Sequence, residues 1–329
     1  MRSLLAVLSL TLTATFASAD WEKTTDGLAK KEGAGYGGLC GVAVDRTNGN
    51  MFLNVSDKGI YRSTDQGATF APFAQPFKGR TEWPGCMTFD PTGKTNRLMI
   101  ALVYGSPMLL GDRDGKTWTV LDKKSVHVDW CAADWSQPSL KFLLAFKHES
   151  GGMLLRSVDG GKTFDDIGKG YASAWVFDDK TAVAMQAKTK DRPQAKLVRT
   201  TDAGATWTPV ADFNSVALPR WNDGKLYWVL DSGLIVSSDQ GATWAKISDL
   251  KDAKLGPVFG KNAGQLFVLA KSGVLESTDF GKTWSKAIPL PTEMKGWSSL
   301  TWLDYDPVHD VLYTMKMTSE LFRFRRGAK

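Results

Sequence analysis

Cysteine and histidine are both scarce in this chain, with three residues of each among 329. The sequence contains no CxxC pair and no HxxxH spacing, so it lacks the usual zinc motifs. Three cysteines in an oxidising compartment cannot all pair within one chain. At least one of Cys40, Cys86 and Cys131 is therefore expected to be free, bound to a metal or bridged elsewhere.

Long hydrophobic runs are also missing. After residue 19 no segment offers about 18 uncharged apolar residues, which argues against a membrane-spanning helix. Before it, Arg2 precedes an apolar run over residues 4–16, and the small residues 17–19 form a cleavage site of the signal-peptide type. We expect residues 1–19 to be a signal peptide and the mature chain to begin at Asp20, exported to the periplasm or secreted.

A concentrated charge of one sign is absent as well. Lysine and arginine number 41 against 35 acidic residues, and the basic residues are scattered along the chain. This distribution is too diffuse for a nucleic-acid interface, so we expect no nucleic-acid partner. Helical periodicity is missing from residues 20–329, which points to an all-β fold. We expect a monomer without a cofactor.

One eight-residue pattern recurs along the chain. It reads STDQGATF at residues 63–70 and SSDQGATW at residues 237–244. A worn copy, GDRDGKTW at residues 111–118, carries Arg113 where the others have Asp. The glycines of successive copies are 48, 46, 43, 37 and 40 residues apart. A period near 40 to 45 residues is typical of a propeller blade. The five full copies share an acidic residue and a glycine at fixed positions: Asp65, Gly67, Asp159, Gly161, Asp202, Gly204, Asp239, Gly241, Asp279 and Gly281.

The residue types in each copy suit a hairpin turn between the third and fourth strands of a blade. An Asp carboxylate accepts hydrogen bonds from nearby backbone N–H groups, Gly supplies a positive φ, and Thr adds a hydroxyl contact. The closing Trp or Phe can then bury between sheets. We interpret the repeated turn as structural rather than functional.

The pattern SxDxGxT followed by Trp or Phe resembles the Asp-box, or BNR, repeat of sialidase-like β-propellers. The resemblance implies that the boxes lie at the blade periphery, away from the ligand-binding face, and it supports fold more than function. The sialidase catalytic motif is missing, because no Arg-Ile-Pro type motif precedes the first box. Arg80 and Arg220 could lie on the funnel, but they do not make the arginine triad of sialidases.

Six boxes predict seven blades. Three more β-rich segments follow the last box, at residues 297–306, 310–317 and 320–326, and the chain then ends without a fourth. Residues 20–25 look like the segment that follows a box, so the N-terminus can complete the last sheet and close the ring. We predict one domain over residues 20–329, an all-β, seven-bladed β-propeller of four-stranded antiparallel blades.

The segments that lead into the innermost strands should form one face around the central funnel. Indoles there could stack on sugar rings, or they could pack between blades. The predicted ligand-binding residues are Trp83, Trp130, Trp175, Arg220, Trp221 and Trp297. The three cysteines fall at equivalent points of three neighbouring inner strands. They could hold a soft metal with His127, form one disulfide, or simply be buried.

Acidic residues on the same face are candidates for acid–base chemistry. Paired carboxylates would suit glycoside cleavage, and an acid with a histidine could serve a lyase, although surface charge is the alternative. The catalytic candidates are Glu82, His127, Asp129, Glu149 and Glu293, with His148 nearby. Three functions stay open: a binding propeller for a glycan, small ligand or partner protein; a carbohydrate-active hydrolase or lyase; and an assembly factor for a membrane complex. The last is implied by the resemblance to Asp-box rings of this size.

Overall fold

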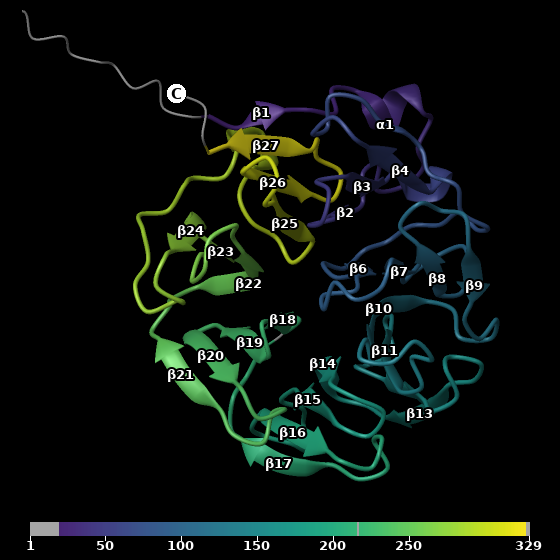
Figure 1. The fold of residues 1–329 in the computed structure, drawn as a ribbon, viewed down its shortest axis with the longest axis vertical. Coiled ribbons are helices and arrows are strands. Elements are labelled where there is room, and N and C mark those ends of the chain that lie inside the picture. The colour runs from purple at the N-terminus through teal and green to yellow at the C-terminus, as the bar shows by residue number, and fades with distance from the viewer. Residues whose placement is uncertain (1–19, 216, 327–329) are drawn as a thin grey trace, which may run out of the picture.

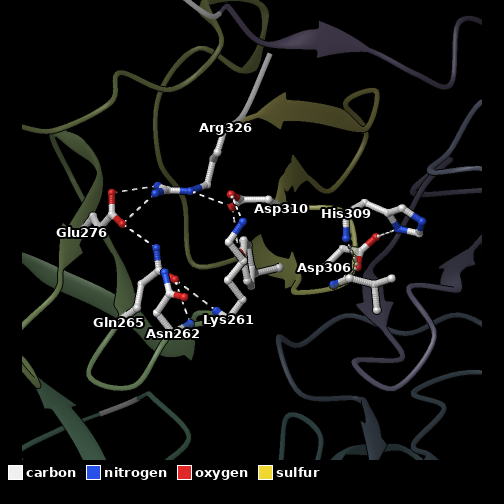
Figure 2. A network of polar contacts seen from close by, with 10 residues as sticks. Lys261, Asn262, Gln265, Glu276, Asp306, His309, Asp310 and Arg326 are labelled. Atoms are coloured by element: carbon white, nitrogen blue, oxygen red, sulfur yellow. Dashed lines mark hydrogen bonds and ion pairs between the residues drawn. The ribbon is translucent and has the colours of Figure 1, made fainter. Parts of the chain in front are cut away.

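The computed structural model describes residues 20–215 and 217–326, so the expected signal peptide lies outside the described residues. Seven antiparallel sheets stand around a central channel as the blades of a propeller (Figure 1). The all-β, seven-bladed prediction is confirmed. The innermost strands, one from each blade, are β2 (Val42–Val44), β6 (Met87–Phe89), β10 (Val128–Ala133), β14 (Tyr171–Val176), β18 (Arg220–Asn222), β22 (Ala253–Phe259) and β25 (Thr301–Asp306).

Each blade continues outward from its inner strand, and blades one to six do so in chain order. Blades one to three add β3 (Met51–Asn54), β4 (Ile60–Ser63), β5 (Ala71–Pro72), β7 (Arg97–Ile100), β8 (Leu109–Asp112), β9 (Trp118–Val120), β11 (Leu143–Lys147), β12 (Leu154–Ser157) and β13 (Asp165–Gly168). Blades four to six add β15 (Ala182–Gln186), β16 (Lys196–Thr200), β17 (Thr208–Ala211), β19 (Lys225–Leu230), β20 (Gly233–Ser237), β21 (Ala245–Ser248), β23 (Leu266–Ala270) and β24 (Gly273–Ser277). Blade seven adds β26 (Val311–Lys316), β27 (Phe322–Arg325) and β1 (Glu22–Lys23).

In residues 20–215 and 217–326 helical structure is limited to short segments. They are α1 (Leu28–Lys31) and two 3₁₀ turns at Ser56–Lys58 and Thr292–Met294. Within the described residues, no helix has both the length and the apolar character needed to cross a bilayer.

The N-terminal strand closes the ring as predicted. β1 pairs with β27, with Glu22 opposite Arg323, and the two segments lie side by side in Figure 1. The Thr24 N–H donates to the Leu321 carbonyl at 2.9 Å, and the Arg323 Nε donates to the Glu22 carboxylate at 2.8 Å. The last sheet therefore takes its outer strand from the opposite end of the chain.

Blade six differs from the other blades, because its sheet has three strands. In place of a fourth strand there is a single bridge, in which Val274 and Ile288 exchange hydrogen bonds of 2.9 and 2.8 Å. Pro289 and Pro291 follow Ile288. Proline has no N–H to donate, so this segment cannot extend the ladder.

The core lies between the blades. Both faces of a blade are covered by its neighbours, so middle strands such as β23 are buried at every position and carry apolar residues without alternation. Aromatic pairs bridge the layers; the Phe52 ring of blade one lies 5.2 Å from the Phe89 ring of blade two. Burial of this kind contributes roughly 25 cal/mol per Å² of apolar surface.

The boxes form internally bonded turns. In blade five the Ser237 hydroxyl donates to the Asp239 carboxylate at 2.8 Å and accepts the Gly241 N–H at 2.8 Å. The Thr243 N–H and hydroxyl also donate to Asp239, at 2.9 and 2.6 Å. Gly241 has φ near +78°, and a Cβ there would lie 2.3 Å from Val183 of blade four. The turn thus requires glycine for its conformation and for its contact with the preceding blade.

The strand order gives the ring two faces. The loops between first and second strands lie on one side of the ring, together with the boxes, which join third to fourth strands. We call this side the box face. The segments that lead into the inner strands and the loops from second to third strands end on the other side. We call this second side the Arg80 face, because Arg80 lies in the segment before β6.

Candidate functional site

A cavity of about 290 Å³ occupies the channel toward the box face. Its walls come from the inner strands of blades one, two, five, six and seven and from the loops that follow the first two. Several charged side chains line it: Arg46, Asp90, Arg113, Arg220 and Asp304. The channel is therefore polar on one part of its wall, while residues such as Val258 and Leu303 keep the rest apolar.

The carboxylate of Asp304 is already occupied by backbone donors. It accepts the N–H of Val44 at 2.7 Å and the N–H of Tyr305 at 2.8 Å. Burial raises the pKa of Asp304, while these hydrogen bonds and the nearby Arg46 and Arg220 act in the opposite direction. Asp304 is thus held in place by blade one as well as by its own strand.

Arg220 is in the opposite situation. Its side chain lines the cavity, yet its guanidinium makes no hydrogen bond or ion pair to any residue that the structure describes. Burial lowers its pKa, and the charge of Asp304 opposes this effect. A guanidinium has five N–H donors, and here none of them has a partner among residues 20–215 and 217–326.

A groove of about 440 Å³ adjoins this cavity and shares Pro91, Thr92 and Trp221 with it. The rings of Trp175 and Trp221 are within 10° of parallel, with centroids 6.4 Å apart. Phe177 meets Trp221 edge-on at 5.9 Å. The structure therefore brings together three predicted ligand-binding residues, Trp175, Arg220 and Trp221. Because Gln240 of a box also lines the groove, it opens on the box face, not on the opposite rim.

The other three tryptophans lie elsewhere, so the five do not surround one opening. Trp83 and Trp297 line a small cavity of about 50 Å³, where the Lys254 ammonium lies 5.6 Å from the Trp297 ring centroid. Trp130 is 1% exposed and stacks on Phe146 at 5.3 Å. An indole buried in this way has no face free for a sugar. The register of β10 shifts between Val128 and Trp130, and such a bulge re-aims the side chains that follow.

The catalytic candidates other than Glu293 gather around His148 and Tyr104 on the Arg80 face. The ring nitrogens of His148 contact two carboxylates, Asp129 Oδ1 at 2.8 Å and Glu82 Oε2 at 3.5 Å. Glu149 lies 3.7 Å from the same ring. Asp129 is the extra residue of the β10 bulge, which aims it at His148. Glu293, in contrast, lies in the 3₁₀ turn Thr292–Met294 near Trp21 and Pro289.

This arrangement holds an imidazole rather than a substrate. His148 lies between Glu82 and Asp129, so its ring fills the space that a scissile bond between two carboxylates would need. Burial raises the pKa of Asp129, and its bond to His148 opposes that rise. The geometry therefore gives no support to a glycosidase that uses this pair.

Arg80 forms the centre of the exposed part of this face. Its guanidinium carbon lies 4.6 Å from the ring centroid of Tyr36 and 4.4 Å from that of Tyr104, and it pairs with Glu82. The Tyr104 ring also meets His127 edge-on at 5.1 Å. Tyr104 is not among the residues predicted from the sequence, because it lies in a loop between second and third strands, where no repeated pattern marks it.

Large apolar side chains are also exposed on this face. Seven such side chains are exposed among the described residues. Four of the seven come from Arg80-face loops of blades one to three: Tyr36 at 75% and Phe77, Tyr104 and Val126 at 37% each. Arg80 and Tyr104 are paired by a backbone bridge, and Val126 precedes His127, which contacts Tyr104. We call these four residues together with Arg80 the aromatic patch.

The three cysteines are free thiols, each at most 8% exposed. Burial raises the pKa of Cys40 to about 12 and that of Cys86 to about 11. In the described part of the chain, no three His, Cys, Asp or Glu side chains are grouped so that they could hold a metal ion. The disulfide and the metal site that their positions allowed are therefore not formed.

Residues 275–286 match the pattern of the BNR/Asp-box repeat. Five boxes share one hydrogen-bonding pattern, in which the box glycine N–H donates to the hydroxyl of the first box residue. They are spaced around the seven-bladed ring, so the repeat is a feature of the whole fold. The chain is a seven-bladed β-propeller that carries Asp-box repeats. A search of curated proteins gives no match.

The Asp-box propeller is similar to several solved structures. One is YCF48 bound to D1 peptide, with 16% identity, 95% of this chain and 98% of that chain covered, and a TM-score of 0.55. YCF48 from Cyanidioschyzon merolae is 13% identical, with 94% and 99% covered and a TM-score of 0.52. The extracellular domain of BT4673 from B. thetaiotaomicron is 7% identical, with a TM-score of 0.61; the match covers 94% of this chain but 40% of that one. These likenesses show the fold.

Proposed function

We propose that this Asp-box propeller binds a polypeptide segment of a partner protein on its Arg80 face. The observation that carries the proposal is the aromatic patch, which gathers four of the seven exposed large apolar side chains on one face. Such patches on a soluble domain mark interaction sites. Tyrosine and arginine are also the side chains that contribute most to binding at protein interfaces.

The patch is held rigid before any partner arrives. The Arg80 guanidinium is fixed between the rings of Tyr36 and Tyr104 and pairs with Glu82. Glu82 is in turn within 3.5 Å of His148, which Asp129 holds from the other side. A fixed side chain loses little conformational entropy on binding. The buried charges therefore serve to position Arg80 and Tyr104, which accounts for them without a catalytic reaction.

The comparison with YCF48 agrees with this proposal. That propeller was solved with a peptide bound, and the present chain matches 98% of its length. At 16% identity the likeness supports only a shared ring, which in YCF48 carries a bound peptide. The residues that we propose for the site are chosen from the contacts of this chain alone. Export, proposed from residues 1–19, would place the interaction outside the cytoplasm.

A displayed library of peptides tiled across the proteins of the source organism tests the proposal. Peptides selected by the wild-type mature chain should bind Tyr104→Ala and Arg80→Ala about tenfold more weakly, because a hot-spot residue is lost. Val308→Ala, a substitution of an exposed apolar residue on the box face, is the matched control and should bind like the wild type. Selection of no peptide, or selected peptides that bind Tyr104→Ala unchanged, would contradict the proposal.

A further inference from the structure

In the channel cavity one guanidinium has no protein partner among the described residues, while two carboxylates of the wall are already hydrogen-bonded. Arg220 lines it without a protein partner, as described above. Of the carboxylates in the wall, Asp304 accepts two backbone N–H groups. Asp90 accepts the N–H and hydroxyl groups of both Thr92 and Thr95, at 2.6 to 2.8 Å. The unmet requirement in this cavity is therefore for an acceptor that can pair with a guanidinium.

The other arginines that line the cavity have hydrogen-bond partners in the protein. Arg113 donates to Asp45 at 2.6 Å and to the Thr47 hydroxyl at 2.9 Å. Arg46 makes a long hydrogen bond of 3.4 Å to the Gly260 carbonyl. Arg220 is thus the guanidinium with the most unused capacity, and its planar fork matches a carboxylate with two parallel hydrogen bonds.

An aromatic wall adjoins the guanidinium. Trp221, the next residue, lines both the cavity and the groove, and Trp175 lies parallel to it. Both indoles are partly exposed. Flat apolar rings with a polar edge suit stacking against another ring, and a groove of about 440 Å³ is in the size range of small-molecule sites.

We infer that the box-face mouth of the channel binds a small ligand in which a carboxylate is attached to a six-membered ring. Arg220 pairs with the carboxylate, and Trp221 and Trp175 contact the ring. This site is separate from the aromatic patch, lies on the opposite face, and does not depend on the proposed partner protein. A sugar acid and an aromatic acid share this chemistry, and direct titration distinguishes them.

The experiment uses the mature chain, titrated with glucuronate and with benzoate and followed by tryptophan fluorescence and calorimetry. Glucose and benzamide are the neutral controls. We expect saturable binding of at least one acid and at least tenfold weaker binding of its neutral counterpart, since a charged hydrogen-bonded pair is lost. Binding of glucuronate alone indicates an acidic saccharide, and binding of benzoate alone indicates an aromatic acid.

Substitutions test whether the ligand binds in the channel. Arg220→Gln should weaken the acid by about tenfold and Arg220→Lys by less, because lysine keeps the charge but not the fork. Arg62→Gln on β4 removes the same charge outside the cavity and should bind like the wild type. Tyr104→Ala should also bind the acid normally, which separates this site from the partner site.

Melting temperatures confirm that each variant is folded before it is titrated. The inference is overturned if neither acid binds saturably, if the neutral analogue binds as tightly as its acid, or if folded Arg220→Gln and Arg220→Lys both bind like the wild type.

Discussion

The guanidinium of Arg113 donates a hydrogen bond of 2.6 Å to the carboxylate of Asp45, which joins the worn box of blade two to blade one. Both residues are buried, and the same guanidinium nitrogen reaches the Thr47 hydroxyl at 2.9 Å. The residue that breaks the box pattern has therefore gained a contact between blades. Within the worn turn, the Thr117 hydroxyl donates to the carboxylate of Asp112, the residue before Arg113, because the usual box aspartate is missing.

Removing this arginine should destabilise the ring. Arg113→Ala leaves the buried Asp45 carboxylate without a cation, with only the donors of Thr47 and Asn48, and the expected loss in the free energy of unfolding is about 3 to 5 kcal/mol. Arg113→Asp restores the regular box residue but also leaves Asp45 without a cation, so it should not rescue stability. Urea denaturation measures both, and an Arg113→Asp variant as stable as the wild type would show that the worn turn, rather than the ion pair, governs this position.

The serine of a box should matter for stability. Ser237 is 3% exposed and bonds both Asp239 and the N–H of Gly241, so Ser237→Ala leaves a buried donor unpaired. We expect a loss of about 1 to 3 kcal/mol. Ser238→Ala, at the exposed neighbouring position, should change stability by less than about 0.5 kcal/mol. Equal effects of the two substitutions, measured by thermal unfolding, would show that the turn bonds do not stabilise the fold.

The box carboxylates give stability a dependence on pH. The hydroxyl of Thr243 and then its N–H lower the pKa of Asp239 from 3.8 to about 2. A carboxyl whose folded pKa is lowered stabilises the fold above its unfolded pKa, and this contribution disappears as pH falls through the folded value. The stability difference between wild type and Asp239→Asn should therefore be constant at neutral pH and shrink between about pH 4 and pH 2. A difference that grows on acidification would reverse the assigned sign.

The N-terminal strand should be needed for a stable ring. A mature chain that lacks residues 20–25 loses β1, including the pairing of Glu22 with Arg323 and the bond from the Trp21 indole to the Pro289 carbonyl at 2.7 Å. The exposed edge of β27 should lower the melting temperature and promote association between copies. Light scattering and calorimetry measure both effects, and unchanged melting would show that closure contributes little.

Two tryptophans from equivalent inner strands should respond differently to substitution. Trp130 is buried, so Trp130→Ala should cost about 3 to 5 kcal/mol of unfolding free energy. Trp175 is only half-buried at the groove, so Trp175→Ala should destabilise less while weakening ligand binding there. Urea denaturation of both variants tests this, and similar losses would show that the groove indole is part of the core.

The number and order of the blades could be read from the sequence because a box is a local turn. Its serine, aspartate, glycine and threonine contact one another within seven residues, so the pattern specifies the turn wherever it occurs. The closure of the ring by the N-terminal strand could also be predicted from the sequence, because the strands after the last box leave the last blade one strand short. The absent fourth strand of blade six had a visible signal too, the prolines at 289 and 291.

The direction of each side chain around the channel was decided only by the tertiary structure. Trp83 precedes its inner strand, while Trp130 and Trp175 lie within theirs, and the three indoles reach a small cavity, the core and the box-face groove respectively. Along a strand, side chains alternate between faces, so one bulge or register shift moves a residue from channel to core. Those shifts, like the pairing of Arg113 with Asp45, depend on neighbouring blades that are tens of residues away in the chain, and local sequence carries no record of them.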